Sequence, residues 1–292
     1  MRHLRVRDLV GYNLLFLLLL GVTLLAALST GPTGVGFSTL VGALQGEVTP
    51  MERAILLRIR LPRVLLAGIA GGALSLSGAA FQALLRNPLA GPCLLGVTGG
   101  GALGGVIALV AGLDRLGFWP IPLVAFLGAT LSMFLIYAVA TERGRLDPTR
   151  LLLSGVIFNA LSSAVVMLIS AIVSAEKLQE IIFWLMGSLA VPREPVIVVV
   201  VGGYVLGGVL LLLPRARDFD LLSLGESDAR QLGVQVERTR TIAFFSAALM
   251  TGAVVSVSGM IGFVGLAVPH IVRRLFGADH RLLFPLTLTG GA

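Results

Sequence analysis

The chain alternates between long apolar stretches and short segments that hold its charged residues. The longest stretches lack Asp, Glu, Lys and Arg and approach or exceed the roughly 20 residues that a helix rising 1.5 Å per residue needs to cross a bilayer. This pattern predicts an all-α, polytopic membrane protein. The predicted spans are residues 12–29, 64–85, 94–113, 116–140, 151–173, 195–213 and 241–257.

Two apolar runs near the end of the chain are shorter. Residues 260–272 contain Pro269, which favours a short or broken helix after a turn at Ser258 and Gly259. Residues 282–292 are too few to cross a membrane, so we expect this sequence to be incomplete at its C-terminus.

Composition supports the membrane interpretation. Charged residues make up 13% of the chain and the mean hydropathy is +0.97, whereas soluble domains have about 25% charged residues. The net charge is +7, and the basic residues lie in the segments between the apolar runs. This placement fits a membrane topology and argues against a nucleic-acid partner. The single cysteine, Cys93, excludes a disulfide within the chain.

The basic residues also predict a topology. The first run has the charge pattern of a signal peptide, but an uncleaved helix is simpler because many spans follow. If the N-terminus is cytoplasmic, 15 of the 22 basic residues face the cytoplasm and 7 face outside, as the positive-inside rule requires. We therefore expect a multi-pass protein of the bacterial inner membrane.

Glycines at four-residue spacing predict close helix packing, as in Gly68/Gly72, Gly100/Gly104 and Gly203/Gly207. Inside the spans only His270 is ionisable, and we interpret it as a structural histidine with internal partners. The chain has no phosphate-binding loop, metal-ligand spacing or nucleophile motif, so we expect neither an enzyme nor a resident cofactor.

The longest cytoplasmic connection, residues 214–240, contains a candidate docking helix. Two glycines bracket about two turns in which apolar and charged residues alternate, the pattern of a short helix that enters a groove on another protein. The alternative is a solvated connector. The glycines are Gly225 and Gly233, the apolar residues Leu224, Ala229, Leu232 and Val234, and the charged residues Glu226, Asp228 and Arg230.

An arginine cluster at the start of the second span breaks the charge rule, because it lies outside. Arg58 is typical of a membrane-interface anchor. Arg60 and Arg63 flank Pro62, and their planar guanidinium groups suit the carboxylates of an acidic soluble partner. The alternative for both is again an interface anchor.

Together these residues resemble the FecCD family, the permease subunits of bacterial ABC importers for ferric siderophores, haem and cobalamin. The matches run in order from the second span to the end of the chain. They are Arg60-Leu-Pro-Arg63, Ser77-Gly78, Gln82, Arg86-Asn-Pro-Leu-Ala90, Leu95-Gly-Val97, Arg150-Leu-Leu-Leu-Ser-Gly155, Trp184-Leu-Met-Gly187, Leu224-Gly-Glu226, Leu232-Gly-Val234, Gly259-Met-Ile-Gly-Phe-Val-Gly-Leu-Ala-Val-Pro-His270 and Asp279-His-Arg281.

The resemblance implies a type II ABC importer permease of ten helices, forming one transmembrane domain over residues 1–292 that ends within helix nine. It further implies a homodimer, two cytoplasmic ATP-binding subunits that hydrolyse the ATP, a periplasmic substrate-binding protein and a metal-chelate substrate. An ion-coupled secondary transporter and a membrane scaffold are the alternatives.

The resemblance also assigns roles to residues. Arg60 and Arg63 would dock the binding protein, and Leu224, Gly225, Glu226, Ala229, Arg230, Leu232 and Gly233 would contact the ATPase. The cytoplasmic gate would comprise Asn87, Leu89, Asp147, Pro148 and Thr149. Asp147-Pro148 departs from the small hydroxyl residues that some members have at this position.

Overall fold

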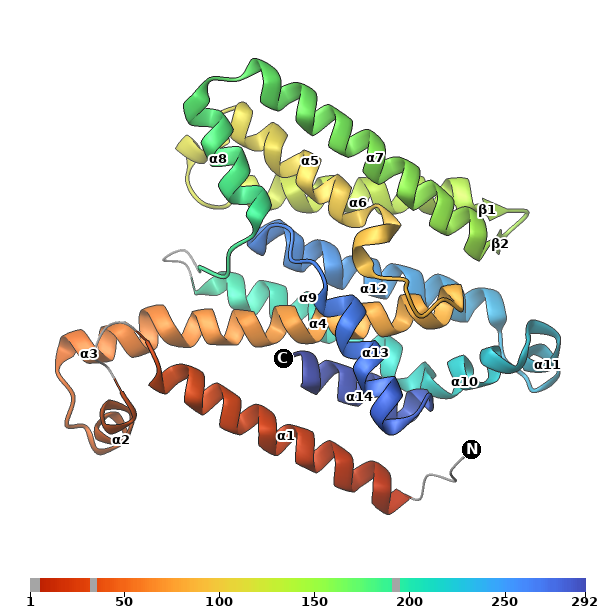
Figure 1. Cartoon of the computed structure of the whole chain (residues 1–292), viewed down its shortest axis with the longest axis horizontal. Coiled ribbons are helices and arrows are strands. Elements are labelled where there is room, and N and C mark those ends of the chain that lie inside the picture. The colour runs from red at the N-terminus through yellow and green to blue at the C-terminus, as the bar shows by residue number, and fades with distance from the viewer. Residues whose placement is uncertain (1–5, 32–35, 191–194) are drawn as a thin grey trace.

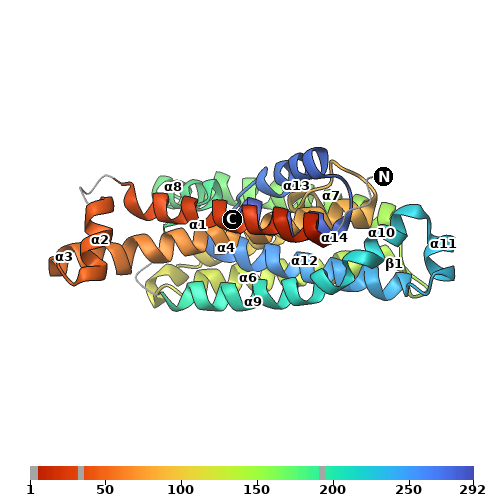
Figure 2. The same ribbon diagram turned by 90° about the horizontal axis from the view of Figure 1, so that it is seen from below.

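In the computed structural model, which describes residues 6–31, 36–190 and 195–292, the chain is a bundle of helices with one short hairpin. Six helices in the described part are long and apolar enough to cross a membrane. They run side by side in Figure 1, and the edge-on view of Figure 2 shows a thin, elongated slab. The long helices are α1 (Val6–Ser29), α4 (Leu61–Leu85), α6 (Pro120–Ala140), α7 (Pro148–Ile172), α9 (Val196–Leu212) and α12 (Val236–Ser258).

Shorter elements connect the long helices. A π-helical turn, Ile55–Arg60, joins α3 to α4, and 3-10 turns lie at Pro92–Leu95, Leu113–Leu116 and Leu213–Arg215. The remaining elements are α2 (Phe37–Gln45), α3 (Pro50–Ala54), α5 (Val97–Val110), β1 (Thr141–Glu142), β2 (Arg145–Leu146), α8 (Ala175–Met186), α10 (Ala216–Leu224), α11 (Glu226–Gln231), α13 (Val264–Phe276) and α14 (His280–Gly291).

Helices α4 and α12 form the centre of the bundle. In their most apolar windows, 67% and 72% of the residues are buried, against none in α1. The Ser77 hydroxyl of α4 donates a hydrogen bond to the Ala247 carbonyl of α12 (3.1 Å), and the buried rings of Phe81 and Phe244 lie 6.3 Å apart. The outer faces of α1 and α7 are left for lipid or another chain.

Close helix packing at glycines is confirmed within the bundle at some positions and stays a prediction at others. A Cβ on Gly100 of α5 would lie 2.6 Å from the Gly128 carbonyl oxygen of α6, so these helices touch through their backbones. Gly203 and Gly207 have no atom of the described residues within 4 Å of such a Cβ, so no helix of the same copy packs closely against them.

The structure differs from the sequence prediction in several short elements. The predicted span 94–113 is broken at Gly96. This residue has a φ of 79°, ends the 3-10 turn Pro92–Leu95 and directly precedes α5. The sequence pattern did not predict α2, α3 or α8, nor the hairpin, in which Thr141 pairs with Leu146. Helix α8 escaped prediction because its first turns carry charged side chains.

The two ends of the slab differ in character. The start of α1, the hairpin, α10 and α11 lie at one end, and α2, α3 and α8 lie at the other (Figure 1). We call these the basic end and the distal end, because most arginines occur in the loops and helix ends of the first.

Candidate functional site

Helices α10 and α11 form a hooked element, residues 216–233, at the basic end (Figure 1). Gly225 separates the two helices with a φ of 138°, and Gly233 follows α11 with a φ of 87°. Both values lie in the region that favours glycine. The predicted short helix between these two glycines is therefore confirmed.

The apolar residues of the hooked element point in two directions. Ala229 is fully buried and packs with Leu222, Val234 and Val236 in a small cluster of its own. Leu232 is 60% exposed and Leu224 is 57% exposed. The exposed leucines are therefore available to a partner, whereas Ala229 holds the element together.

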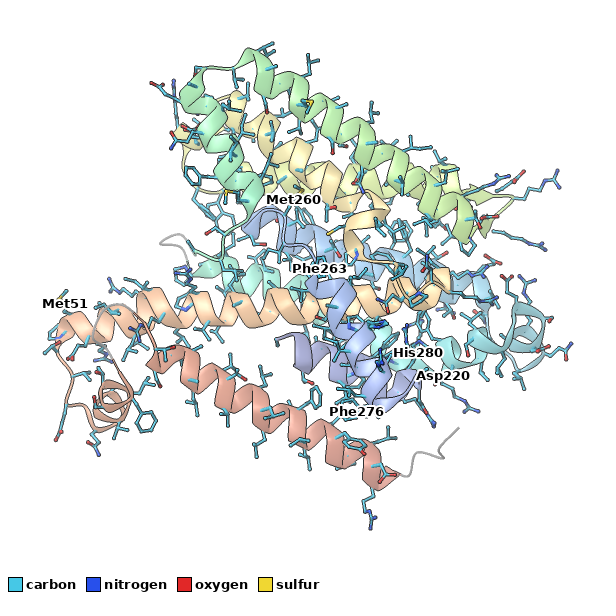
Figure 3. All side chains as sticks on the ribbon, in the orientation of Figure 1. Met51, Asp220, Met260, Phe263, Phe276 and His280 are labelled. Atoms are coloured by element: carbon cyan, nitrogen blue, oxygen red, sulfur yellow. The ribbon has the colours of Figure 1, made fainter. Side chains whose placement is uncertain are left out.

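Hydrogen bonds tie α10 to three helices of the bundle. The Arg86 guanidinium, at the end of α4, donates to the Leu222 carbonyl (2.8 Å). The Thr239 hydroxyl of α12 donates to Asp218 (3.2 Å). At the start of α14, His280 contacts Asp220, and Figure 3 shows the two side chains together.

Ion pairs tie α11 to the start of α12. The buried Arg240 pairs with Glu226, and this hydrogen bond holds the pKa of the Glu226 carboxyl below its usual value. Arg230 pairs with Glu237 (3.1 Å), and the second Glu237 oxygen accepts from the Leu146 N–H of the hairpin (3.1 Å). Glu237 thus connects α11 to the loop before α7.

The predicted gate residues lie in two loops at the basic end. The Asn87 side chain accepts a hydrogen bond from the Leu89 N–H (2.9 Å) and shapes the turn after α4, while Leu89 is 65% exposed. Asp147 caps α7 by accepting from the N–H groups of Thr149 (2.8 Å) and Arg150 (2.9 Å). Pro148 is the first residue of that helix. The two loops share no hydrogen bond among the described residues.

The predicted docking arginines lie at the distal end in different environments. Arg60 is 8% exposed, and its guanidinium donates to the Leu28 carbonyl of α1 (2.8 Å). Arg63 is exposed, and so is Arg58. In this conformation Arg60 braces the last turn of α1, and Arg63 faces outward.

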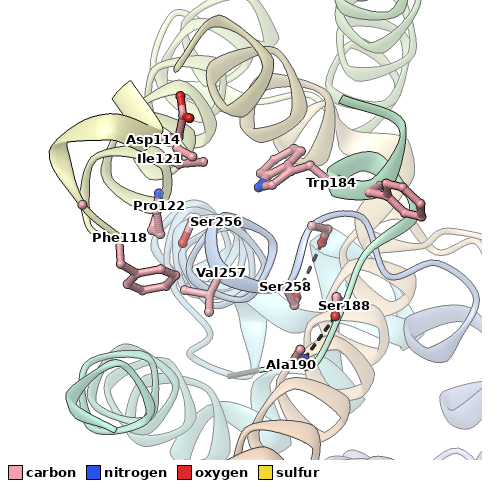
Figure 4. Close-up of a pocket in the computed structure, with 13 residues that line it drawn as sticks. Asp114, Phe118, Ile121, Pro122, Trp184, Ser188, Ala190, Ser256, Val257 and Ser258 are labelled. Atoms are coloured by element: carbon pink, nitrogen blue, oxygen red, sulfur yellow. Dashed lines mark hydrogen bonds between the residues drawn. The ribbon is translucent and has the colours of Figure 1, made fainter. Parts of the chain in front are cut away.

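A cavity of about 420 Å³ also opens near the distal end, between α6, α8 and α12 (Figure 4). Phe118, Trp184 and Val257 supply apolar walls, and Ser256 and Ser258 contribute hydroxyl groups. Both hydroxyl groups donate to carbonyls of their own helix, so they are already partnered. None of the sequence-predicted site residues lines this cavity.

Comparison with known proteins identifies the family. Residues 17–292 match the FecCD transport family. The chain belongs to this family. It is 40% identical to the cobalamin import system permease BtuC of Halobacterium salinarum over 258 residues, which cover 85% of this chain and 67% of the relative. It is 37% identical to the hemin transport system permease HmuU of Yersinia pestis over 289 residues, covering 98% and 84%.

A solved structure agrees with this family assignment. A transporter described as of the metal-chelate ABC type, in an inward-facing conformation, superposes with a TM-score of 0.84 at 32% identity, covering 96% of this chain and 86% of that chain. The family and its curated members are permeases of ABC importers, in which a separate subunit hydrolyses ATP. The predicted family and transport class are confirmed.

Sequence reasoning missed the anchors of the hooked element. Asp218, Asp220 and Thr239 carried no local signal, because their partners lie at least 21 residues away. Arg86 and His280 fell within motifs of the resemblance, but their hydrogen bonds require the fold.

Proposed function

We propose that this chain is the membrane-spanning subunit of an ATP-driven importer that passes a metal chelate from an external binding protein into the cytoplasm. Its family and its relatives, named for cobalamin and hemin, support this function. In this proposal the basic end and the N-terminus lie in the cytoplasm, which the excess of arginine at that end supports through the positive-inside rule.

The hooked element is the contact with the ATPase in this proposal. Its exposed Leu224 and Leu232 suit an apolar groove, and Gly225, Glu226, Arg230 and Gly233 fix its shape. The observation that carries the proposal is its anchoring to α4, α12 and α14. An element tied in this way moves with the helices, so a push from the ATPase is transmitted to them.

Two connections lead from the hooked element to the predicted gate. Arg86 binds Leu222 and directly precedes Asn87, the first gate residue. Glu237 binds Arg230 and the hairpin, which leads into Asp147. Movement of the element thus displaces both gate loops.

Two copies of the chain, each with one ATPase subunit, enclose the path in this proposal. Helix α7 supports pairing because only 11% of its most apolar window is buried within one copy. The binding protein docks at the distal end through Arg63, with Arg60 positioned to join once α1 moves away from its guanidinium.

Purification of the permease with its ATPase tests the proposal. Leu232→Arg places a charge on the exposed face of the hooked element, and Leu116→Arg places one on a leucine at the distal end that is even more exposed. We expect only Leu232→Arg to lose the ATPase, with both variants inserted and folded. Equal ATPase recovery from both variants would remove the hooked element from the interface.

A further inference from the structure

The connection between α4 and α5, residues 87–96, turns back into the bundle (Figure 1). It begins at the predicted gate residue Asn87 and contains the buried Pro92. A Cβ on Gly265 of α13 would lie 2.7 Å from the Pro92 Cδ, so the connection packs tightly against that helix. We call residues 87–96 the first gate loop and residues 147–149 the second. The first gate loop therefore reaches from the basic end into the interior.

Backbone contacts hold the inner part of the first gate loop against α7. A Cβ on Gly155 of α7 would lie 2.7 Å from the Leu95 Cα, closer than real Cβ atoms approach another atom. A Cβ on Gly96, at the end of the 3-10 turn, would lie 3.2 Å from the Gly155 carbonyl oxygen. Small residues allow backbones within a membrane to approach this closely. The turn and α7 therefore pack backbone against backbone.

One turn further along the same face of α7, the Asn159 side chain adds a hydrogen bond. Its Nδ2 donates to the Cys93 carbonyl of the 3-10 turn (2.6 Å), across 66 residues of sequence. A Cβ on Gly99 of α5 would collide with the Asn159 side-chain oxygen, so the amide fits closely between the turn and α5. Asn159 is the only Asn or Gln in α7 and lies roughly 16 Å from the start of that helix, at 1.5 Å per residue. This bond therefore joins two segments within the membrane.

The charge pattern of the sequence did not reveal this contact. It pointed to His270 as the ionisable residue inside the spans, and we expected internal partners for that side chain. His270 is instead exposed and makes no hydrogen bond among the described residues. The uncharged amide of Asn159 does bond to another segment, which only the fold reveals.

Helix α7 carries the contact to the second gate loop. It begins at Pro148, directly after its cap Asp147. The two gate loops share no hydrogen bond with each other among the described residues, and the hooked element reaches them by separate routes through Arg86 and Glu237. A helix that begins in one loop and binds the other through Asn159 joins the two routes, because a rigid element transmits displacement along its length.

We propose that Asn159 is a positioning residue that joins the two gate loops, so that they open and close together when the hooked element moves. The inference rests on the proposed gate and on ATP-driven import. A path with two gate loops conducts only while both are open. Loops that move independently would therefore let ATP be hydrolysed without transport.

Hydrogen exchange tests the link without ATP or substrate. In the full-length permease in nanodiscs, Asn87→Ala removes the acceptor of the Leu89 N–H and loosens the first gate loop. We expect exchange in the first turn of α7 to rise about threefold, the effect of one hydrogen bond between transmembrane helices, and this rise to vanish when Asn159→Leu is added. A rise that is absent from Asn87→Ala alone, or that persists with Asn159→Leu, would overturn the link.

Two further variants keep this test decisive. Asn13→Leu is the matched control, because Asn13 donates to the Leu9 carbonyl of its own helix (2.7 Å), and the transmitted rise should persist in it. Gly99→Ala displaces the Asn159 amide without changing α7, so the rise should vanish there as well. If Asn159→Leu fails to insert, Gly99→Ala gives the answer.

Transport by the intact importer tests the joint movement of the loops. In proteoliposomes with the ATPase and the binding protein, we expect Asn159→Leu to move about threefold less chelate per ATP, with the bound ATPase and its hydrolysis rate unchanged. Asn13→Leu should match the unmodified protein, and equal ratios in the two variants would remove Asn159 from gating. If the unmodified importer carries none of cobalamin, hemin and ferric enterobactin, the proposed cargo fails instead, and hydrogen exchange still decides whether Asn159 joins the loops.

Discussion

The Asp220 carboxylate of α10 accepts two hydrogen bonds from His280 at the start of α14. The ring Nδ1 lies 2.6 Å from Asp220 Oδ1 and the backbone nitrogen 2.8 Å from the same oxygen. The His280 ring is buried against Phe219 of α10 and Phe284 of α14. The hooked element and α14 therefore share both a polar and an aromatic contact.

This contact predicts a loss of coupling in Asp220→Ala. Removing the carboxylate leaves the buried His280 donors without a partner, which lowers the unfolding free energy by about 1–3 kcal/mol. We expect the amount of chelate transported per ATP to fall more than the rate of ATP hydrolysis, because the ATPase still binds the element. Proteoliposomes that report both rates provide the measurement.

A double-mutant cycle with His280→Ala serves as the control. If the two side chains act as a pair, the double variant will be no worse than either single variant. Additive losses in the ratio of transport to hydrolysis would show that Asp220 and His280 act independently.

Capping of α7 predicts which residues Asp147 can be exchanged for. Because its side chain accepts from two N–H groups, Asp147→Ala should lower stability by about 1 kcal/mol, whereas Asp147→Ser should retain most of it. Serine can accept the same bonds, which accounts for the small hydroxyl residues expected at this position in other members. Thermal unfolding of both variants measures these stabilities. An equal loss of stability in Asp147→Ala and Asp147→Ser would show that capping is not what Asp147 contributes.

The sequence predicted the long spans well because lipid imposes a strict requirement. A helix that crosses a bilayer needs an uninterrupted apolar run, and α6 and α12 follow such runs to within several residues. The break at Gly96 was missed because the residues on both sides are apolar, and only the backbone angle reveals it.

For the candidate sites, the sequence predicted the local structure but not the contacts between distant segments. Gly225 and Gly233 predicted the short helix of the hooked element, because glycine at both ends of a short helix is a signal in the local sequence. The burial of Ala229 and the bond from Arg60 to Leu28 depend on segments distant in sequence, which no local pattern encodes. The partner roles of these residues stay predictions.

The distal arginines predict a separation of effects. Arg63→Glu should weaken docking of the binding protein roughly tenfold at low salt, with the difference shrinking as salt screens the charges. Arg60→Glu should also lower thermal stability, because its guanidinium bonds to α1. Arg58→Glu is the matched control, since Arg58 is also exposed and lies in the π-helical turn that leads into α4. Equal docking by Arg63→Glu and the unmodified protein at low salt would leave Arg63 as a membrane anchor.

The Glu226 carboxyl predicts a pH dependence. Its bond to Arg240 lowers its folded pKa, so the pair stabilises the hooked element fully above the unfolded pKa of about 4.3 and loses this contribution as pH falls through the folded value. Hydrogen exchange of residues 226–233 should thus be steady from pH 5 to 8, after correction for intrinsic rates, and show opening in stronger acid. In Glu226→Gln this acid-dependent opening should be absent, and its persistence would point to another group.

The central claim is that ATP hydrolysis by a partner drives import through this chain. The most direct measurement compares uptake of cobalamin, hemin and ferric enterobactin into proteoliposomes that contain the permease and its ATPase, with loaded binding protein outside and either ATP inside or an imposed sodium or proton gradient. We predict uptake of a chelate with ATP alone, abolished by vanadate and by Leu232→Arg. Uptake driven by an ion gradient without ATP would contradict the account.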